Sequence, residues 1–376
     1  MKNHRSILSL ALIFAFAAPA MFSSSLPGCK KKNEPQPDSG IFRSDDAGVT
    51  WTQKNVIEGK KILPKVDTAN LFFDQENSKV IYLTTRGSGI FVSKNRGESW
   101  QGANINSGNI YKIVFHPENK EIIYIVGYID NKGTVAKSAD NGQTWQSIYD
   151  DPIPTPSAVF DLVIDNYNPQ IFYIGTGWGG ILKSEDEGAS WKRILEIGEK
   201  TQKIIMSEKD SQALVVTTMN NGIFKTFNGG ESWINLKLNI ENKNQPASSQ
   251  INDETEPAEN LEKIPVSRIN DFYWAENRDR FYISAPEGLF YSDDQGSTWQ
   301  DLETLPPKGT MEILTFAINP ENENEIIYAS PTAVFKSENL GESWLPKKVM
   351  AKNFVRMIKY DPNDPNIVYL GTRLGN

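Results

Sequence analysis

The chain has 376 residues, a formal net charge of −8 and a pI of about 5.1. This acidic balance argues against a general nucleic-acid binder, because such proteins present a basic surface to the phosphates. Hydrophobic residues make up 39% and aromatic residues 11% of the sequence, which is enough to build a packed core. The length alone is compatible with one large domain or with two ordinary ones.

The N-terminal segment has the pattern of a secretory signal. Basic residues at Lys2 and Arg5 precede an apolar run over residues 7–22. That run is too short for a transmembrane helix and lacks the clear boundaries of one, and it is typical of a signal peptide. We therefore expect residues 1–28 to be a signal that is removed during export.

The end of this segment indicates a lipid anchor. Its Leu-Pro-Gly-Cys sequence ends at Cys29 and resembles the bacterial lipobox, in which cleavage leaves the cysteine as the lipidated first residue; Pro27 departs from the small residues usual at its position. Cys29 is the only cysteine, so an intrachain disulfide and a cysteine metal site are both excluded. The alternative is ordinary cleavage near Ala20 or Ser25, with Cys29 left as an incidental thiol.

A polar, proline-containing stretch follows the cysteine. Residues 29–39 suit a flexible tether between a membrane and a folded domain, because the segment has few groups that a core could bury. Together with the lipid anchor, this tether predicts attachment to a bacterial membrane on the extracytoplasmic side of the cell envelope.

The rest of the chain is organised by one motif that recurs seven times. It reads Ser or Thr, any residue, Asp or Asn, any residue, Gly, any residue, Thr or Ser, Trp, and successive copies start 42 to 66 residues apart. Seven of the nine tryptophans occupy its last position. The Asp or Asn positions are Asp46, Asn95, Asp140, Asp186, Asn228, Asp294 and Asn339.

Each copy follows a short β-run and has the chemistry of a hairpin turn. Its Asp or Asn can accept hydrogen bonds from turn amides, its Gly supplies a positive φ, and its Trp packs back onto the sheet. The pattern resembles the Asp-box, also called the BNR repeat, over about residues 40–376, and it implies a four-stranded propeller blade per repeat. The second half of each repeat is a hairpin with an Asp-, Asn- and Pro-rich turn.

The order of these halves predicts a closed ring. The region begins with a second-half hairpin over residues 40–51 and ends with a first-half hairpin over residues 355–372. Neither can satisfy its sheet edge alone, and joined they make one blade. We therefore expect an all-β fold, a single seven-bladed propeller over residues 40–376. Residues 239–263 are acidic with few large apolar side chains, so we expect them to be a disordered loop insertion.

The blade topology separates the motifs from the expected binding face. The Asp-boxes and the Pro-containing turns lie on one face, and the usual ligand face carries the other loops. On that side, aligned positions of the innermost strands form what we call the central ring, in which four consecutive blades alternate Lys and Asp. Its members are Asn70, Lys112, Asp161, Lys203, Asp271, Thr315 and Met357.

The central ring has two interpretations. Buried charges need partners, so mutually neutralising pairs alone explain the alternation. Alternatively, the ring is a polar pocket for a small or extended ligand. Further candidates lie in loops on the same face: Arg86, Tyr128, Asp130, Trp178, Asn220, Glu287, Arg356 and Arg373. The glycines around Trp178 suggest that its indole is an exposed platform for a sugar or a protein. The indole could equally fold over its neighbours.

Metal and nucleophile chemistry have little support in the sequence. There are two histidines, and one of them, His4, falls in the signal. We find no His and carboxylate cluster, no Gly-rich phosphate loop and no Gly-x-Ser-x-Gly elbow, so we expect neither a metal nor a cofactor.

Several families share the repeat, and they imply different functions. Sialidases are similar in the Asp-box but usually have six blades and a signature absent here. Xyloglucanase-type hydrolases resemble the repeat text more closely but generally pair two propellers. Sortilin-type receptors have more blades and a Cys-rich appendage. A single seven-bladed ring behind a lipobox is most similar to photosystem II assembly and stability factors and their relatives, a resemblance that implies binding or assembly.

Two functional hypotheses follow. The first is a non-catalytic, membrane-tethered propeller that acts as a monomer and binds a protein or glycan on the face opposite the Asp-boxes. The second is a glycan-active hydrolase, for which Asp161 and Asp271 are the candidate carboxylates; their alternation with Lys112 and Lys203 disfavours a protonated acid. Asp161 and Asp271 each paired with a lysine would count against the second hypothesis.

Overall fold

A computed structural model describes residues 39–58, 61–62, 66–105, 107–153, 157–238, 264–331, 333–349, 351 and 353–373. They belong to one compact unit that runs from Pro37 to Asn376. The expected signal, Cys29, nearly all of the expected tether and the expected loop over residues 239–263 lie outside the described residues. None of the described residues forms a helix with the length and hydropathy that crossing a membrane requires.

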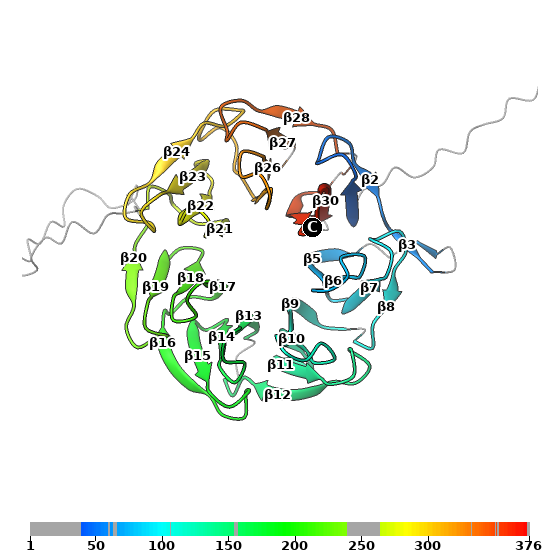
Figure 1. Cartoon of the computed structure of the whole chain (residues 1–376), viewed down its shortest axis with the longest axis vertical. Helices are drawn as coiled ribbons and strands as arrows, with labels where there is room; N and C mark the ends of the chain where they lie inside the picture. The colour runs from blue at the N-terminus through cyan, green and yellow to red at the C-terminus, as the bar shows by residue number, and fades with distance from the viewer. Residues whose placement is uncertain are drawn as a thin grey trace, which may run out of the picture. The chain divides into compact units, whose positions relative to one another are not determined.

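The unit is built from four-stranded antiparallel blades arranged in a ring (Figure 1). The first blades, from innermost to outermost strand, are β5 (Asp67–Phe73), β6 (Ile81–Arg86), β7 (Ile90–Ser93) and β8 (Gln101–Gly102); β9 (Asn109–Phe115), β10 (Ile123–Ile129), β11 (Lys132–Ser138) and β12 (Gln146–Asp150); β13 (Val159–Ile164), β14 (Phe172–Thr176), β15 (Gly180–Ser184) and β16 (Lys192–Glu196).

The remaining blades follow the same order. They are β17 (Thr201–Met206), β18 (Leu214–Thr218), β19 (Ile223–Thr226) and β20 (Ile234–Leu236); β21 (Asp271–Ala275), β22 (Arg280–Ser284), β23 (Leu289–Ser292) and β24 (Gln300–Leu302); β25 (Thr315–Ile318), β26 (Ile326–Ala329), β27 (Val334–Ser337) and β28 (Leu345–Lys347); and β29 (Val355–Asp361), β30 (Asp364–Thr372), β1 (Ile41–Ser44) and β2 (Thr52–Gln53). A small hairpin pairs β3 (Val56–Ile57) with β4 (Lys61–Ile62).

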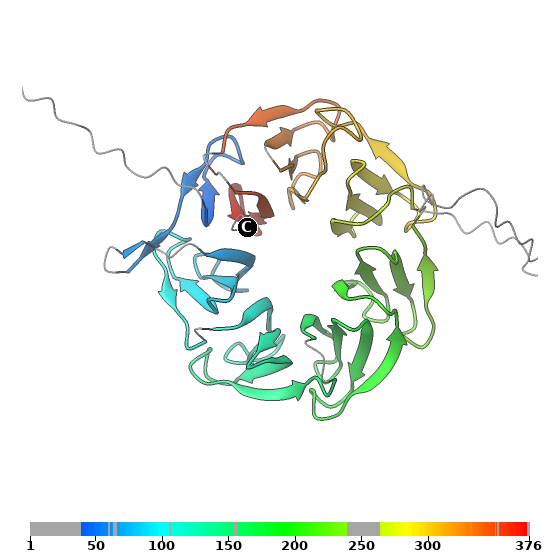
Figure 2. The ribbon, with the colours of Figure 1, turned by 180° about the vertical axis from the view of Figure 1, so that it is seen from behind.

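The last blade joins the two ends of the unit. Strand β1 pairs with β30 in antiparallel register from Ile41 opposite Gly371 to Ser44 opposite Val368. The Gly40 amide also donates to the Thr372 hydroxyl over 2.8 Å. The expected all-β propeller with ring closure by terminal half-blades is therefore confirmed. Figure 2 shows the same ring from behind, with the blades radiating from its axis.

The core lies between adjacent blades. Innermost strands bury apolar positions on either side of a β-bulge, as in β9, where Ile110 and Ile113 are buried and the two residues between them are half-exposed. One cluster combines Ile41 and Tyr369 of the closing blade with Leu71 of the next blade, all fully buried. Burial of each such side chain stabilises the fold by about 1.5–3 kcal/mol. Each blade thus needs its neighbours to cover its faces.

The Asp-box turns have one repeated hydrogen-bond geometry. In the first, the Asp46 carboxylate accepts from the Val49 amide (3.1 Å), the Thr50 amide (2.8 Å) and the Thr50 hydroxyl (2.6 Å). The Ser44 hydroxyl accepts from the Gly48 amide over 2.7 Å. Gly48 has a φ of 87°, which favours glycine at this position. These bonds satisfy the polar groups of the turn locally, so the repeated residues of the motif stabilise the hairpin of each blade.

We expect the Asp-boxes to set part of the acid sensitivity of the fold. The Thr144 hydroxyl, the Thr144 amide and the Ser138 hydroxyl lower the pKa of Asp140 to about 2. Burial alone would raise the pKa of Asp46, but hydrogen bonds in its turn lower it to about 2. A carboxyl with a depressed pKa stabilises the folded state above its unfolded pKa, and this contribution is lost as pH falls toward 2.

The test exploits the three blades that already carry Asn. Replacing all four acidic positions (Asp46→Asn, Asp140→Asn, Asp186→Asn and Asp294→Asn) should leave the melting temperature near pH 7 little changed. Between about pH 4 and pH 2, the melting temperature should fall less steeply than in the wild type, because the lost carboxylates no longer titrate. Equal slopes measured by circular dichroism would contradict this expectation.

Candidate functional site

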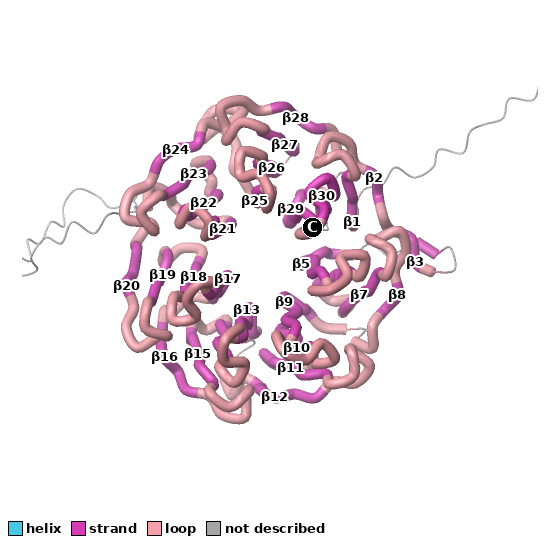
Figure 3. The backbone as a smooth tube through the Cα atoms, in the orientation of Figure 1, coloured by secondary structure: helices cyan, strands magenta, loops and turns pink. Residues whose placement is uncertain are grey.

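The innermost strands line the centre of the ring of blades (Figure 3). They pair the four charged members of the predicted central ring, whereas Met357 is buried in a hydrophobic cluster and does not join the polar group. Lys112 of β9 forms an ion pair with Asp161 of β13, the next blade. Asp161 is 4% exposed and also accepts from the Leu162 amide (2.7 Å) and from the Ile204 amide of the following blade (2.8 Å). Both carboxylate oxygens are therefore occupied as hydrogen-bond acceptors.

A second pair repeats the arrangement two blades further on. Lys203 of β17 forms an ion pair with Asp271 of β21 and donates to the Phe272 carbonyl over 2.9 Å. The other oxygen of Asp271 accepts from the Thr315 hydroxyl over 2.7 Å. The ring thus links consecutive blades through charge pairs, as the first of its two interpretations predicted.

A third lysine near the ring was not anticipated from the sequence. Lys359 lies two residues beyond Met357 on β29, so both side chains point to the same side of the strand. Its Nζ donates to the Leu71 carbonyl over 2.8 Å and lies 4.7 Å from the centroid of the Phe72 ring. Burial, reinforced by the charges of Lys203 and Lys112, lowers the pKa of Lys359 to about 7. This amine therefore titrates near neutral pH.

Three arginines gather on the face opposite the Asp-boxes. Arg356 lies near the start of β29, Arg373 follows β30, and Arg86 ends β6 of the neighbouring blade. Burial and the positive charges of Arg373 and Arg86 lower the pKa of Arg356. Among the described residues, neither Arg356 nor Arg86 has a side-chain hydrogen bond or an ion pair, and Arg373 reaches only Asp67, at 3.9 Å. Arg86 and Arg356 therefore carry positive charge without an ion pair in the described ranges, although the carboxylates of Glu312 and Asp67 lie near Arg356.

Aromatic side chains continue this surface over the next two blades. Burial raises the pKa of Tyr111, and the positive charge of Arg86 opposes this increase. The two side chains therefore lie close together. Tyr111 stacks on Phe160 with a centroid distance of 4.7 Å, and the Lys200 ammonium lies 5.9 Å from the Phe160 ring. We refer to Arg356, Arg373, Arg86, Tyr111, Phe160 and Lys200 together as the cationic band.

The aromatic part of the band was not anticipated from the sequence. Tyr111 and Phe160 each precede a central-ring residue by one position, and Arg356 occupies the same aligned place. Reading the position before the ring, and not only the ring and the position after it, reveals two aromatics and a cation on one face. Tyr111, Phe160 and Arg356 are each the extra residue of a β-bulge that has no partner in the register with the next strand, so the bulges insert the band residues directly before the ring residues.

Trp178 is half-buried and folds over its own turn. Its indole N–H donates to Asp151 over 3.0 Å, and its ring lies where a side chain on Gly180 would otherwise be. Arg193 lies 5.9 Å from its ring. Because Gly180 has no side chain, it leaves room for the indole. Trp178 is thus folded over its neighbours, which was the alternative to an exposed platform.

The other loop candidates are dispersed. Tyr128 is half-buried in β10 and Asp130 is exposed in the following turn. The Asn220 side chain donates to Glu199, while Glu287 accepts from the Ser267 amide. Tyr128 and Asp130 share the β10–β11 hairpin, whereas Asn220 and Glu287 belong to two other blades, so the structure does not gather the four residues into one site.

No metal centre is evident in the described ranges. No group of three or more His, Cys, Asp or Glu side chains there is arranged to hold an ion. The His116 Nδ1 accepts from the Glu118 and Asn119 amides, at 3.2 and 3.1 Å, and so caps a turn.

Sequence comparisons place the chain among Asp-box proteins. A family model described as "Sortilin, neurotensin receptor 3" matches residues 39–162. The xyloglucanase Xgh74A of Acetivibrio thermocellus is 23% identical over 54% of this chain and 30% of its own length. The oligoxyloglucan-reducing end-specific xyloglucanase of Emericella nidulans is 22% identical over 89% of this chain and 40% of its own length. The chain thus spans less than half of either enzyme.

Solved structures share the fold at low identity. The GH74 enzyme of Niastella koreensis has a TM-score of 0.61 and 14% identity, over 88% of this chain and 53% of that one. YCF48 from Cyanidioschyzon merolae has a TM-score of 0.59 and 13% identity, over 83% of this chain and 97% of that one. YCF48 bound to D1 peptide has a TM-score of 0.57 and 16% identity, over 82% and 93%.

An extracellular domain completes the set. That of the B. thetaiotaomicron protein BT4673 has a TM-score of 0.58 and 13% identity, over 85% of this chain and 39% of that one. The repeated motif, the matched family description and the shared architecture together identify the chain as a β-propeller built on Asp-box repeats, similar to sortilin-type, xyloglucanase and YCF48 propellers.

Proposed function

We propose that the chain is a non-catalytic, extracytoplasmic binding or assembly propeller that is tethered to a membrane through Cys29 and engages a protein partner. The cationic band is the observation that carries this proposal. It combines cations, of which Arg86 and Arg356 lack ion-pair partners among the described residues, with a stacked aromatic pair, which is a composition typical of protein-binding hot spots. Its positive charge favours an acidic segment of the partner.

The similarities support a binding role and an extracytoplasmic location. One similar propeller, YCF48, has been solved bound to D1 peptide, and another is an extracellular domain. Both share only the fold with this chain, so the identity of its own partner has to come from experiment.

The partner should depend on the cationic band. We expect a pull-down with the full tethered chain to lose its partner in the double variant Arg86→Glu and Arg356→Glu, because charge reversal repels an acidic surface. Lys94→Glu, an exposed change in an Asp-box turn, is the matched control and should retain the partner. If the double variant retains the partner, the cationic band is not the surface that binds it. Trp178→Ala in the same assay tests that residue separately.

The membrane tether has its own test. Cys29→Ser should abolish incorporation of a labelled fatty acid and release the chain from the membrane fraction, because the lipidated thiol is removed. The unchanged chain should carry the label and sediment with membranes. Retention of Cys29→Ser in the membrane would instead indicate an uncleaved signal or another anchor.

A glycan-active hydrolase is the second candidate, favoured by the similarity to xyloglucanases. Glycoside hydrolysis generally needs a carboxylic acid that donates a proton and a second carboxylate. In this chain Asp161 and Asp271 are each held by a lysine and by amide or hydroxyl donors. Xyloglucan turnover that Asp161→Asn and Asp271→Asn abolish would favour this alternative over the binding role.

A further inference from the structure

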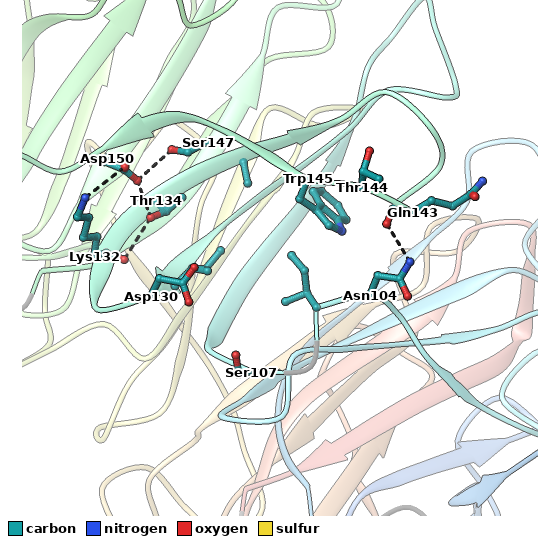
Figure 4. Close-up of a pocket in the computed structure, with 13 residues that line it drawn as sticks. Asn104, Ser107, Asp130, Lys132, Thr134, Gln143, Thr144, Trp145, Ser147 and Asp150 are labelled. Carbon is teal, nitrogen blue, oxygen red and sulfur yellow. Dashed lines mark hydrogen bonds and ion pairs between the residues drawn. The ribbon is translucent and has the colours of Figure 1, made fainter.

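A second surface lies away from both the cationic band and the central ring. On the outer side of the blade β9–β12, a hollow of about 530 Å3 is bounded by the β10–β11 hairpin, by β12 and by the segment that precedes β9 (Figure 4). Its volume falls within the range of roughly 300–1,000 Å3 that is usual for small-molecule sites.

An extended hairpin forms one wall of the hollow. Asp130 and Asn131 have φ values of 49° and 66°, a two-residue turn that lets β10 and β11 pair as far as Ile129 opposite Lys132. Alternation then divides the strand: Val135 packs in the core on one side, whereas Thr134 and Ala136 lie on the other side, where Ala136 joins a second core cluster and both residues border the hollow. The two-residue turn therefore lengthens the β10–β11 hairpin, and the lengthened hairpin forms this wall of the hollow.

Trp145 supplies an aromatic surface with an unused donor. It is half-buried and lines the hollow together with Ile105 and Ile129. In five other Asp-boxes the indole N–H donates to a backbone carbonyl: Trp100, Trp191, Trp233, Trp299 and Trp344. The N–H groups of Trp145 and of Trp51, the tryptophan of the sixth other Asp-box, are buried and have no acceptor among the described residues. A buried donor of this kind requires an acceptor, such as a ligand oxygen or water.

The polar side chains that line the hollow include both hydrogen-bond acceptors and hydrogen-bond donors. Asp150 accepts from Thr134 (3.0 Å) and Ser147 (2.9 Å), and Lys132 lies 3.6 Å from it. The exposed Asp130 carboxylate has no hydrogen bond or ion pair within the described part of the chain. Two carboxylates beside one ammonium disfavour an anionic ligand and suit hydroxyl donors.

The hollow continues past Lys132 and Asp150. A second hollow of about 490 Å3 shares these two residues and extends to Asp151 and Pro152. Its Asp151 is the residue that accepts from Trp178. A ligand made of repeated units therefore has room on both sides of the Lys132 and Asp150 pair.

We propose that this lateral groove binds a neutral hexose oligomer. One face of a pyranose packs on Trp145, while the Asp130 and Asp150 carboxylates accept hydrogen bonds from sugar hydroxyls. This combination of an aromatic wall and carboxylate acceptors recognises an uncharged polyol and offers little to an acidic peptide. The site is additional to the proposed partner surface and independent of it.

The test is calorimetric titration of the full chain in detergent with maltohexaose, cellohexaose and mannohexaose. At least one should bind saturably. Asp130→Ala should weaken that binding at least about tenfold, because an acceptor worth about 1.4 kcal/mol or more is lost. Asp279→Ala is the matched control, since Asp279 is also exposed and has a φ of 53° in a β-turn. It should leave binding unchanged.

A second pair of variants tests the aromatic wall. Trp145→Phe should weaken binding at least about tenfold, and Trp299→Phe, at the equivalent position of another Asp-box, should not. The proposal is overturned if none of the three sugars binds, or if Asp130→Ala binds like the wild type. The double variant Arg86→Glu and Arg356→Glu should bind the sugar normally, so failure of the partner surface and failure of this site are distinguishable.

Discussion

Asp161→Ala is expected to lower the free energy of unfolding by about 3–5 kcal/mol, the largest loss among the substitutions considered. Asp161 is buried and accepts from the Lys112 ammonium and from the amides of Leu162 and Ile204. Its removal leaves a charge and two amides without their acceptor in the central ring. Because the Ile204 amide belongs to the next blade, the loss weakens the contact between blades.

Guanidinium unfolding followed by tryptophan fluorescence measures the effect. The control Lys94→Ala, at an exposed turn position, should change stability by less than about 0.5 kcal/mol. Combining Lys112→Met with Asp161→Leu should recover much of the loss, because a buried ion pair replaced by apolar groups leaves no unpaired charge. A loss below about 1 kcal/mol for Asp161→Ala would mean that water replaces the carboxylate, and the pairing would not be structural.

Lys359→Met should stabilise the protein at neutral pH, which is the opposite of the usual outcome for an interior substitution. Burial and two neighbouring lysines disfavour the charged amine, so the pKa of Lys359 falls from 10.5 to about 7. Methionine keeps the stem that packs near Phe72 and removes the charge. Loss of the bond to the Leu71 carbonyl offsets part of the gain. We expect a net gain of about 1–3 kcal/mol near pH 7.

The pH dependence distinguishes this cause from simple packing. Between about pH 7 and pH 10.5 the unfolded lysine holds a proton that the folded one has lost, so wild-type stability should rise with pH. The Lys359→Met variant lacks this term, and its advantage should shrink as pH increases from 6.5 to 9.5 in denaturant unfolding. A constant difference across this range would show that the amine is not destabilised by its surroundings.

Repeats explain why the fold could be predicted from the sequence. Each Asp-box carries a strand, a turn with a positive φ and a packing tryptophan, so a local pattern specifies a whole hairpin. Alignment of the repeats then found the alternation of Lys112, Asp161, Lys203 and Asp271, because aligned strand positions share one environment.

The features that could not be predicted depend on spatial contacts, which no local sequence pattern contains. Lys359 lies outside the aligned ring, and its pKa follows from lysines contributed by two distant blades. The position of Trp178 depends on the space above Gly180, whereas glycines in a sequence indicate equally well an exposed loop. The lateral groove depends on how far one hairpin extends beside a neighbouring segment.

The seam between β1 and β30 has a mechanical consequence. Strand β1 lies between β2 and β30, so a pull on the chain before Gly40 is resisted by both neighbours at once. The bonds between antiparallel strands then carry the load along the strand direction and must break together, which is harder than peeling an edge strand. With the proposed membrane tether, force applied to the chain before Gly40 would therefore act on the same blade that closes the ring.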